Sequence, residues 1–291
     1  MPELPEVETI VRGLRKKLLS LEFTHSDVRL PKCLQNSPEP LFPSLRNEKI
    51  LAVERRGKNI LLHLSGGKAL IIHLRMSGRL RFVRKDVPLE KHTHVIFWFK
   101  NHPFQLRFVD PRQFGRISLE KKVEDGRLLS LARLGPEPLE ISASEFLFMV
   151  RQKSRSIKPL LLDQHFLAGI GNIYADETLH LARIYPRREA KAIKKEALLR
   201  LYEGIQGILK KAIQARGTSV RSYVDARGFA GGYQRQLKVY GREGEPCDSC
   251  GTPIVRERIG GRSSFYCPRC QMPDRKKRGR KREGERKVLP R

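Results

Sequence analysis

Four cysteines near the end of the chain have the spacing of a metal site. Cys247 and Cys250 are separated by two residues, and sixteen residues further on Cys267 and Cys270 repeat the pair. Two thiolate pairs spaced in this way close a tetrahedron around zinc, and two disulfides are the alternative. Because four thiolates leave no position for water, the predicted zinc is structural. Cys33 stands apart and is predicted to be an unpaired, packed thiol.

The segment between the two cysteine pairs is predicted to form a hairpin. Residues 254–259 and 261–266 read as two strands that join at Gly260-Gly261, and this turn places Arg262 at the tip. An arginine at such a tip is either solvated or, in a strongly basic chain, in contact with a phosphate. The local sequence leaves both interpretations open.

The opposite end of the chain offers a nucleophile. Removal of Met1, which is usual before a proline, would expose the secondary amine of Pro2. An α-amino group has a reference pKa near ~8, so part of it is unprotonated at neutral pH and can attack an electrophilic carbon to form an iminium. Glu3 lies within reach to exchange protons. The alternative is a plain helix cap, in which residues 2–6 place acidic side chains beside the positive helix end.

Apolar periodicity predicts the elements that position these residues. A first helix is expected over residues 4–18, where the apolar positions share one helical face. After residue 135 the sequence becomes helical, with segments near 142–153, 173–184 and 189–215. Between these two regions, short β-rich runs separated by turns predict an antiparallel sandwich or barrel. These runs cover residues 51–55, 59–64, 69–74, 79–83, 95–100, 105–109 and 115–119.

Net charge indicates the class of partner. The 291 residues carry +28, and residues 271–291 account for +7 of it, so +21 remains on the body of the chain. Such an excess attracts polyanions, which makes nucleic acid the leading partner, although a basic ribosomal or membrane-surface protein would also fit. Apolar runs fall far short of the ~20 residues that span a bilayer, and the acidic start is unlike a secretory signal, so we expect a soluble cytoplasmic protein.

Several motifs together resemble those of one known family. The chain is similar, in motif type and order, to bacterial formamidopyrimidine-DNA glycosylases over about residues 2–271. The motifs are Pro2-Glu-Leu-Pro-Glu-Val-Glu-Thr9, Arg56-Gly-Lys58, His73-Leu-Arg-Met-Ser-Gly78, Asp110-Pro-Arg-Gln-Phe-Gly115, Ile157-Lys-Pro159, Gly169-Ile-Gly-Asn-Ile-Tyr-Ala-Asp-Glu177 and the four cysteines.

The resemblance implies an α+β multidomain fold and a DNA-repair activity. It divides the chain into a β-sandwich catalytic domain with flanking helices (1–135), a helix-two-turn-helix DNA-binding domain (136–236) with a lesion-capping loop (217–233), a four-cysteine zinc finger (237–271) and a basic disordered tail (272–291). It implies removal of oxidised purines such as 8-oxoguanine and formamidopyrimidines from duplex DNA, followed by β,δ-elimination at the abasic site. Zinc is the one cofactor expected, and the protein is expected to be a monomer.

Catalytic roles follow from the resemblance residue by residue. Pro2 matches the nucleophile that attacks C1′ and forms a Schiff base, and Glu3 matches the acid that assists base loss. Lys58 matches a proton donor beside the lesion phosphate; alone it would read as a surface lysine of a hairpin. Arg262 matches the hairpin arginine that grips the bent DNA and donates a proton in the second elimination.

Other matched positions concern DNA and lesion binding. A flipped nucleotide leaves a hole in the stack, which the family fills with residues matching Met76, Arg112 and Phe114; Met76 and Phe114 would otherwise read as core residues. Phosphate contacts match Lys158 and Asn172, with the Gly169-Ile-Gly171 turn presenting a helix N-terminus to the anion, and more weakly His92 and Lys153. Lesion-capping positions are Thr218, Val220, Arg221, Ser222 and Tyr223, and the other lesion-proximal acids are Glu6 and Glu177.

Two rival functions remain open to test. A sister group of glycosylases acts on oxidised pyrimidines, and Glu6-Val-Glu8-Thr9 together with the three void-filling residues argues against it. A non-catalytic zinc-ribbon protein that binds nucleic acid would predict nothing special about Pro2. Glu177 could instead cap a helix, and His92 and Lys153 could be an ordinary strand-end histidine and a solvated lysine. The tail resembles a nuclear-localisation run in composition, with plain DNA affinity as the simpler explanation.

Overall fold

The computed structural model describes residues 1–35, 41–219, 223 and 228–272. Two four-stranded antiparallel sheets make up the first part of the chain, in the strand orders β1-β6-β7-β5 and β2-β3-β4-β8. Their strands are β1 (Phe23–Val28), β2 (Ile50–Arg56), β3 (Asn59–Leu64), β4 (Lys68–His73), β5 (Arg79–Arg84), β6 (Thr93–Phe99), β7 (Phe104–Val109) and β8 (Arg116–Lys121).

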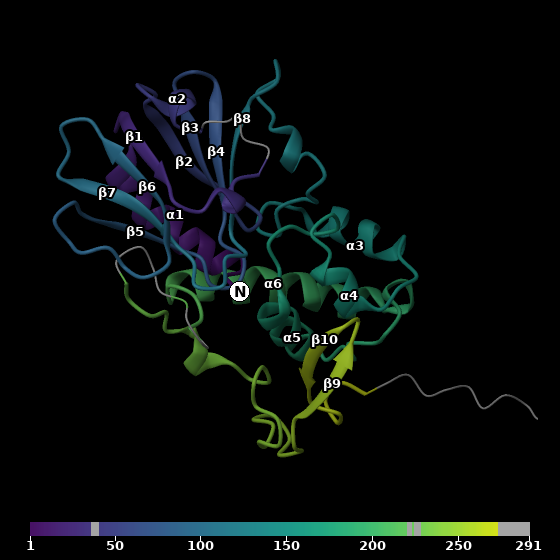
Figure 1. Cartoon of the computed structure of the whole chain (residues 1–291). Helices are drawn as coiled ribbons and strands as arrows, with labels where there is room; N and C mark the ends of the chain where they lie inside the picture. The colour runs from purple at the N-terminus through teal and green to yellow at the C-terminus, as the bar shows by residue number, and fades with distance from the viewer. Residues whose placement is uncertain (36–40, 220–222, 224–227, 273–291) are drawn as a thin grey trace, which may run out of the picture.

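Helix α1 (Leu4–Leu18) connects the sheets to the rest of the molecule. Proline in its first turn and a reciprocal capping box between Glu3 and Glu6 fix its start. Val7, Ile10 and Leu14 are buried in one core with the apolar faces of both sheets, whereas Leu4 packs into a second, helical core. The first turn of α1 therefore sits at the junction of the two cores, where Figure 1 places the N-terminus.

The second core is helical. It is formed by α3 (Ala143–Arg151), α4 (Ile157–Leu162), α5 (Asn172–Leu181) and α6 (Lys195–Gln214). The remaining short elements are α2 (Leu41–Leu45) and the 3-10 turns η1 (Pro31–Cys33), η2 (Leu129–Leu131), η3 (Ala190–Ala192) and η4 (Tyr233–Gln236). The hairpin of β9 (Val255–Ile259) and β10 (Arg262–Tyr266) packs beside α5 (Figure 1).

Most of the predicted elements are confirmed. Strand β1 and the short helices α2 and α4 were not expected from the sequence. The predicted helix over 189–215 begins only at Lys195, because residues 190–192 form a separate 3-10 turn and Lys194 is extended. Cys33 is free and buried, as predicted.

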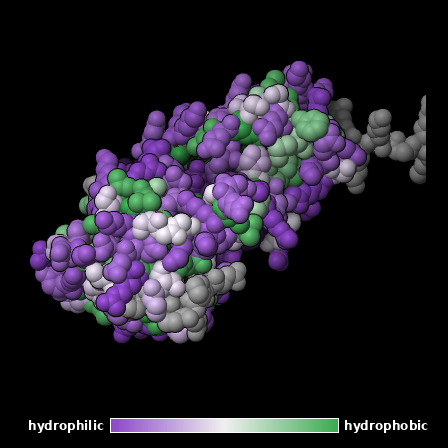
Figure 2. Space-filling model, turned by 90° about the horizontal axis from the view of Figure 1, so that it is seen from above, coloured by the Kyte–Doolittle hydropathy of each residue, from purple (hydrophilic) through white to green (hydrophobic). Residues whose placement is uncertain are grey.

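The surface is largely polar. Figure 2 shows one face on which hydrophilic residues predominate and apolar residues form small, separate patches. No helix among the described residues is long and apolar enough to cross a membrane.

Candidate active site and nucleic-acid interface

Pro2 and Glu3 are buried where α1 meets the first turn of α5. The Glu3 carboxylate accepts backbone hydrogen bonds from Ile173 at 3.0 Å and Tyr174 at 3.4 Å. A Cβ at Gly171 would lie 2.2 Å from Glu3 Cδ, so glycine is needed here to make room for the carboxylate. Glu3 thus binds two amides of the helix N-terminus at which the sequence predicts a phosphate contact, and that phosphate contact stays a prediction.

Glu6 lies at the centre of a buried hydrogen-bond network. Its carboxylate accepts the hydroxyl of Tyr174 at 2.6 Å and the backbone N–H groups of Thr218 at 2.7 Å and Glu3 at 2.8 Å. Burial raises the pKa of Glu6 to about 7; the Glu3 charge adds to the rise, and the three hydrogen bonds oppose it. The network joins the N-terminal helix, α5 and the start of the 217–233 loop.

Lys58 is 6% exposed and is held in place by its neighbour in the chain. The N–H of Gly57 donates to Glu137 at 2.6 Å, which fixes the left-handed turn just before Lys58. Burial lowers the pKa of Lys58 and the Arg262 guanidinium adds to the decrease, whereas Glu3 opposes it. A lysine with a lowered pKa gives up its proton more readily, which suits proton transfer.

The three predicted void-filling residues lie on exposed turns. Met76 is 41% exposed and Phe114 is 47% exposed, so neither is a core residue. The Arg112 guanidinium lies 5.0 Å from the centroid of the Phe114 ring, within cation–π range. Large apolar side chains held in solvent are the type of group that inserts into a base stack.

Asp110, which the sequence analysis did not assign, joins the two turns. Its buried carboxylate accepts the hydroxyl of Ser77, next to Met76, and the backbone N–H groups of Arg112 and Gly115. The side chain thus fixes both turns relative to each other. One signal in the sequence pointed to this role, the position of Asp110 at the start of the Asp110-Pro-Arg motif. An Asp side chain before such a turn often accepts a hydrogen bond from the backbone two residues further along the chain.

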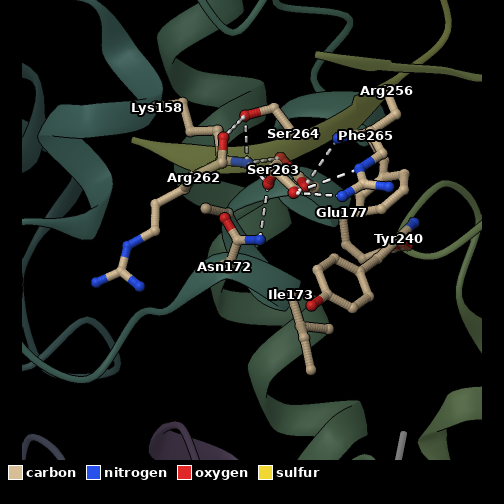
Figure 3. Close-up of polar contacts among 12 residues, drawn as sticks. Lys158, Asn172, Ile173, Glu177, Tyr240, Arg256, Arg262, Ser263, Ser264 and Phe265 are labelled. Atoms are coloured by element: carbon tan, nitrogen blue, oxygen red, sulfur yellow. Dashed lines mark hydrogen bonds and ion pairs between the residues drawn. The ribbon is translucent and has the colours of Figure 1, made fainter. Parts of the chain in front are cut away.

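Lys158 and Asn172 both contact the zinc hairpin. The Lys158 ammonium is fully buried, 2.6 Å from Asp176, and it donates to Ser263 O at 2.9 Å and Ser264 Oγ at 2.7 Å. Asn172 Nδ2 also donates to Ser263 O, at 2.8 Å (Figure 3). Asn172 is half-buried and Lys158 is buried, and the phosphate contacts predicted for both residues stay predictions.

Glu177 supports the chain leading into the zinc module. Its two carboxylate oxygens accept the backbone N–H groups of Lys238, Val239 and Tyr240, each at 2.9 Å. This placement gives Glu177 an anchoring role and does not support either the predicted lesion contact or a helix cap.

The remaining predicted residues are spread along the sandwich and helical parts. His92 is half-buried with a left-handed backbone, and its carbonyl accepts the N–H of Asp110 beside the void-filling turns. Lys153 is exposed. Among the capping positions, Thr218 is buried and the Tyr223 hydroxyl donates to Glu6 O at 3.3 Å. Val220, Arg221 and Ser222 lie outside the described residues.

The four cysteines converge at the base of the hairpin. Their sulfur atoms all lie within 4.8 Å of one another, and neighbouring pairs are 3.4, 3.5 and 3.9 Å apart. Zn–S bonds of 2.3 Å in a tetrahedron require S···S separations of about 3.8 Å, whereas a disulfide needs about 2 Å. The sulfur cluster therefore fits a four-coordinate zinc ion.

Comparison with known proteins agrees with this arrangement. Family models match residues 1–117 (formamidopyrimidine-DNA glycosylase N-terminal domain), 134–224 (its H2TH domain) and 244–271 (zinc finger found in FPG and IleRS). The formamidopyrimidine-DNA glycosylase of Pelotomaculum thermopropionicum is 50% identical over 275 residues, covering 93% of this chain and 99% of that protein. The chain belongs to the formamidopyrimidine-DNA glycosylase family. The enzyme of Desulforamulus reducens is 48% identical, covering 93% of this chain and 99% of that protein.

Solved structures of family members have the same fold. A Lactococcus lactis FPG variant in complex with Fapy-dG-containing DNA superposes with a TM-score of 0.87 at 36% identity, covering 94% of this chain and all of the other. MutM in complex with DNA containing carbocyclic 8-oxo-G gives 0.86 at 36% identity, again with 94% and 100% coverage. As a member of this glycosylase family, the chain has one structural zinc site, formed by its four cysteines.

Replacing Cys270 with serine should remove zinc and DNA affinity together. Without the metal, the hairpin that carries Arg262 loses its base, because structural zinc supplies folding free energy directly. We expect affinity for duplex DNA to fall by about 10- to 100-fold, equivalent to one or two charge-assisted contacts. Zinc stoichiometry and DNA titration measure both effects. Cys33→Ala is the matched control and should keep zinc. Full DNA affinity in zinc-free Cys270→Ser would contradict the role of zinc in holding the hairpin that carries Arg262.

Ionisation of Glu6 should destabilise the folded protein as the pH rises. The folded-state pKa of about 7 lies above the ordinary value of 4.5, so between these values the folded state binds the extra proton and stability falls with increasing pH. The total loss is on the order of 3 kcal/mol. Glu6→Gln should add a constant penalty from the mismatched Glu3 N–H but flatten this slope. Urea unfolding at intervals from pH 5 to 8 measures it, and an unchanged slope in Glu6→Gln would refute the assignment.

Proposed function

We propose that this glycosylase removes oxidised purines, such as 8-oxoguanine and formamidopyrimidines, from duplex DNA through a Schiff base on Pro2. The observation that carries the proposal is the burial of Pro2, Glu3 and Lys58 at one junction, with Arg262 close enough to lower the Lys58 pKa. A non-catalytic zinc-ribbon protein has no need to bury an acid and a lysine beside its N-terminus. The titles of the solved relatives name DNA containing Fapy-dG, carbocyclic 8-oxo-G or an abasic site as their ligands.

The first chemical step uses the N-terminal amine. Met1 is half exposed and open to removal, after which the nitrogen of Pro2 has a lone pair. That lone pair forms a bond to C1′ while the C1′–base bond breaks, and the electron pair of the broken bond leaves with the base. Glu3, fixed by the α5 amides, supplies or relays the proton that the departing base and the opening sugar ring require.

Strand cleavage follows from an iminium. This iminium forms when the Pro2 nitrogen has lost its proton and its lone pair makes the C1′=N bond, while the C1′–O4′ bond of the sugar ring breaks and O4′ takes up a proton. The positive nitrogen of the iminium acidifies the C2′ proton, so loss of that proton expels the 3′ phosphate, and a second elimination expels the 5′ phosphate. Lys58 is proposed to donate a proton beside the lesion phosphate, and Arg262 is proposed to hold the bent backbone and assist the second step. Hydrolysis of the iminium then releases Pro2. The nucleotide must first leave the stack, and Met76, Arg112 and Phe114 are proposed to fill the hole.

Other parts of the family assignment stay as predictions. These are duplex DNA as this chain's partner, the division of the chain at residues 135, 236 and 271, a monomeric state, a cytoplasmic location and DNA contacts by His92, Lys153 and Asn172. The predicted capping loop is supported by Thr218, near its start, and Tyr223, within it, which both hydrogen-bond to Glu6.

Cleavage of defined duplexes tests the substrate class. We expect strand cleavage of an 8-oxoguanine:cytosine duplex at a rate at least ~10-fold above that of a thymine-glycol duplex, since the pocket must discriminate by base contacts. Both new strand ends should carry phosphate, which gel mobility against synthetic markers identifies. Preferential cleavage of thymine glycol would instead assign the chain to the oxidised-pyrimidine group.

A further inference from the structure

The zinc hairpin is docked on the helical part through a buried polar cluster. Lys158 comes from α4 and contacts Ser263 and Ser264 of β10, and Asp176 comes from α5 and contacts Phe265 of the same strand. In Figure 3 the side chain of Arg262 extends away from Lys158, Ser263 and Ser264. Arg262 itself is exposed.

The ammonium of Lys158 is engaged with the hairpin and with Asp176. It donates hydrogen bonds to Ser264 Oγ at 2.7 Å and Ser263 O at 2.9 Å, and it forms an ion pair with Asp176 Oδ1 at 2.6 Å. Lys158 and Asp176 are both fully buried. In this arrangement the side chain of Lys158 is committed to the hairpin.

The acceptors belong to the backbone that determines where Arg262 points. Ser263 O is the carbonyl immediately after Arg262, and it receives hydrogen bonds from both Lys158 and Asn172. The other oxygen of Asp176 accepts the N–H of Phe265 at 3.0 Å. Two consecutive points on β10 are therefore held by one buried ion pair.

The tip of the hairpin is constrained at the same place. Gly260 has a left-handed φ of 56°, and a Cβ there would lie 2.9 Å from Cγ of Pro159, the residue after Lys158. The zinc cysteines hold the far end of the hairpin. Between these two ends, Arg262 has a fixed base from which to reach outward.

We propose that Lys158 and Asp176 are positioning residues that aim Arg262 at the DNA, and that Lys158 is not itself a phosphate contact. Burying a charged pair costs desolvation free energy, which good geometry and additional hydrogen bonds must offset. Here those hydrogen bonds go to β10, the strand that carries Arg262. The inference rests on the proposed role of Arg262 in DNA binding.

A double-mutant cycle with Arg262→Ala tests the coupling. The measured quantity is the dissociation constant for a duplex containing a tetrahydrofuran abasic analogue, which needs no chemistry. We expect Asp176→Asn and Arg262→Ala each to weaken binding by about 10-fold, the cost of one charge-assisted contact. The double variant should bind no more weakly than Arg262→Ala alone. Additive losses, about 100-fold in the double variant, would overturn the inference.

Salt dependence separates positioning from direct contact. Asp176→Asn releases the Lys158 ammonium from its ion pair. If Lys158 binds a DNA phosphate, this variant should keep or steepen the dependence of log K for DNA binding on log salt concentration. Positioning predicts the opposite, a slope lowered by about one, as in Arg262→Ala. An unchanged or steeper slope in Asp176→Asn therefore refutes the inference. Lys195→Met, which removes an exposed charge on α6, is the control for net charge.

A second variant guards against simple unfolding. Lys158→Met/Asp176→Leu removes both charges together, which is often tolerated where loss of one partner is not. If this variant is folded and zinc-loaded, it should still lose affinity by about 10-fold and show no further loss on adding Arg262→Ala. Wild-type affinity would contradict positioning. If Arg262→Ala alone binds DNA like the wild type, Arg262 has no role in binding and the inference fails. Trapping of the adduct on Pro2 tests the proposed activity independently of this result.

Discussion

Blocking the nitrogen of Pro2 should abolish base excision and strand cleavage without affecting zinc or DNA binding. A short N-terminal extension joined to Pro2 turns the proline nitrogen into an amide nitrogen, which has no nucleophilic lone pair. The proline ring stays in place. We expect the rate on an 8-oxoguanine:cytosine duplex to fall by at least ~10³-fold, as when a covalent nucleophile is removed elsewhere. Single-turnover cleavage measures the loss.

The matched control is the same protein after proteolytic removal of the extension. Cleavage directly before Pro2 restores the secondary amine, and activity should return to that of protein processed in the cell. Met1 is half exposed while Pro2 is buried, so an extension before Pro2 leads out to solvent and should leave DNA binding intact. The DNA affinity of the extended form checks that the extension does not obstruct the site. Full activity with a blocked nitrogen would exclude Pro2 as the nucleophile.

Replacing Lys58 with glutamine should damage base excision more than cleavage of a pre-formed abasic site. Lys58 is buried near Glu3 and Arg262, so its proton is available where the base and the lesion phosphate are proposed to lie. We expect excision of 8-oxoguanine to fall by about 10²-fold or more, the usual contribution of a positioned acid or base. Cleavage at an abasic site should stay within about 10-fold, measured on the two duplexes in parallel.

Lys58→Arg distinguishes proton transfer from charge. Arginine keeps the positive charge but holds its proton at every relevant pH, so this variant should bind DNA well and still excise slowly. Equal losses on both duplexes in Lys58→Gln would contradict the role assigned to this lysine.

Local patterns were sufficient to predict most of the fold. The apolar face of α1 and the four cysteines each lie within a short stretch of sequence, so period and spacing identify them. Strand β1 was missed because Phe23–Val28 alternates weakly, with Thr, His, Ser and Asp in its interior, and pairs with the distant β6. Helix α4 was missed because six residues with proline in the first turn give no helical period.

The contacts of a site residue could be predicted where its motif lies on one segment, and could not be predicted where the partner is remote in sequence. Lys158 reads as a phosphate-binding lysine because its ion-pair partner is 18 residues away and its hairpin acceptors about a hundred residues away. Glu177 is similar, since the three amides that it binds lie more than 60 residues on. Glu137, which supports the turn before Lys58, carries no chemical motif of its own. Only tertiary structure brings such partners together.

Borohydride trapping with mass-spectrometric mapping tests the central claim most directly. Enzyme lacking Met1 is mixed with an 8-oxoguanine:cytosine duplex and reduced, and the protein–DNA adduct is then digested. The iminium proposed here predicts a stable adduct whose modified peptide begins at Pro2, with the mass added to the proline nitrogen. An adduct on Lys58 or another lysine, or no adduct with fully processed protein, would contradict the mechanism.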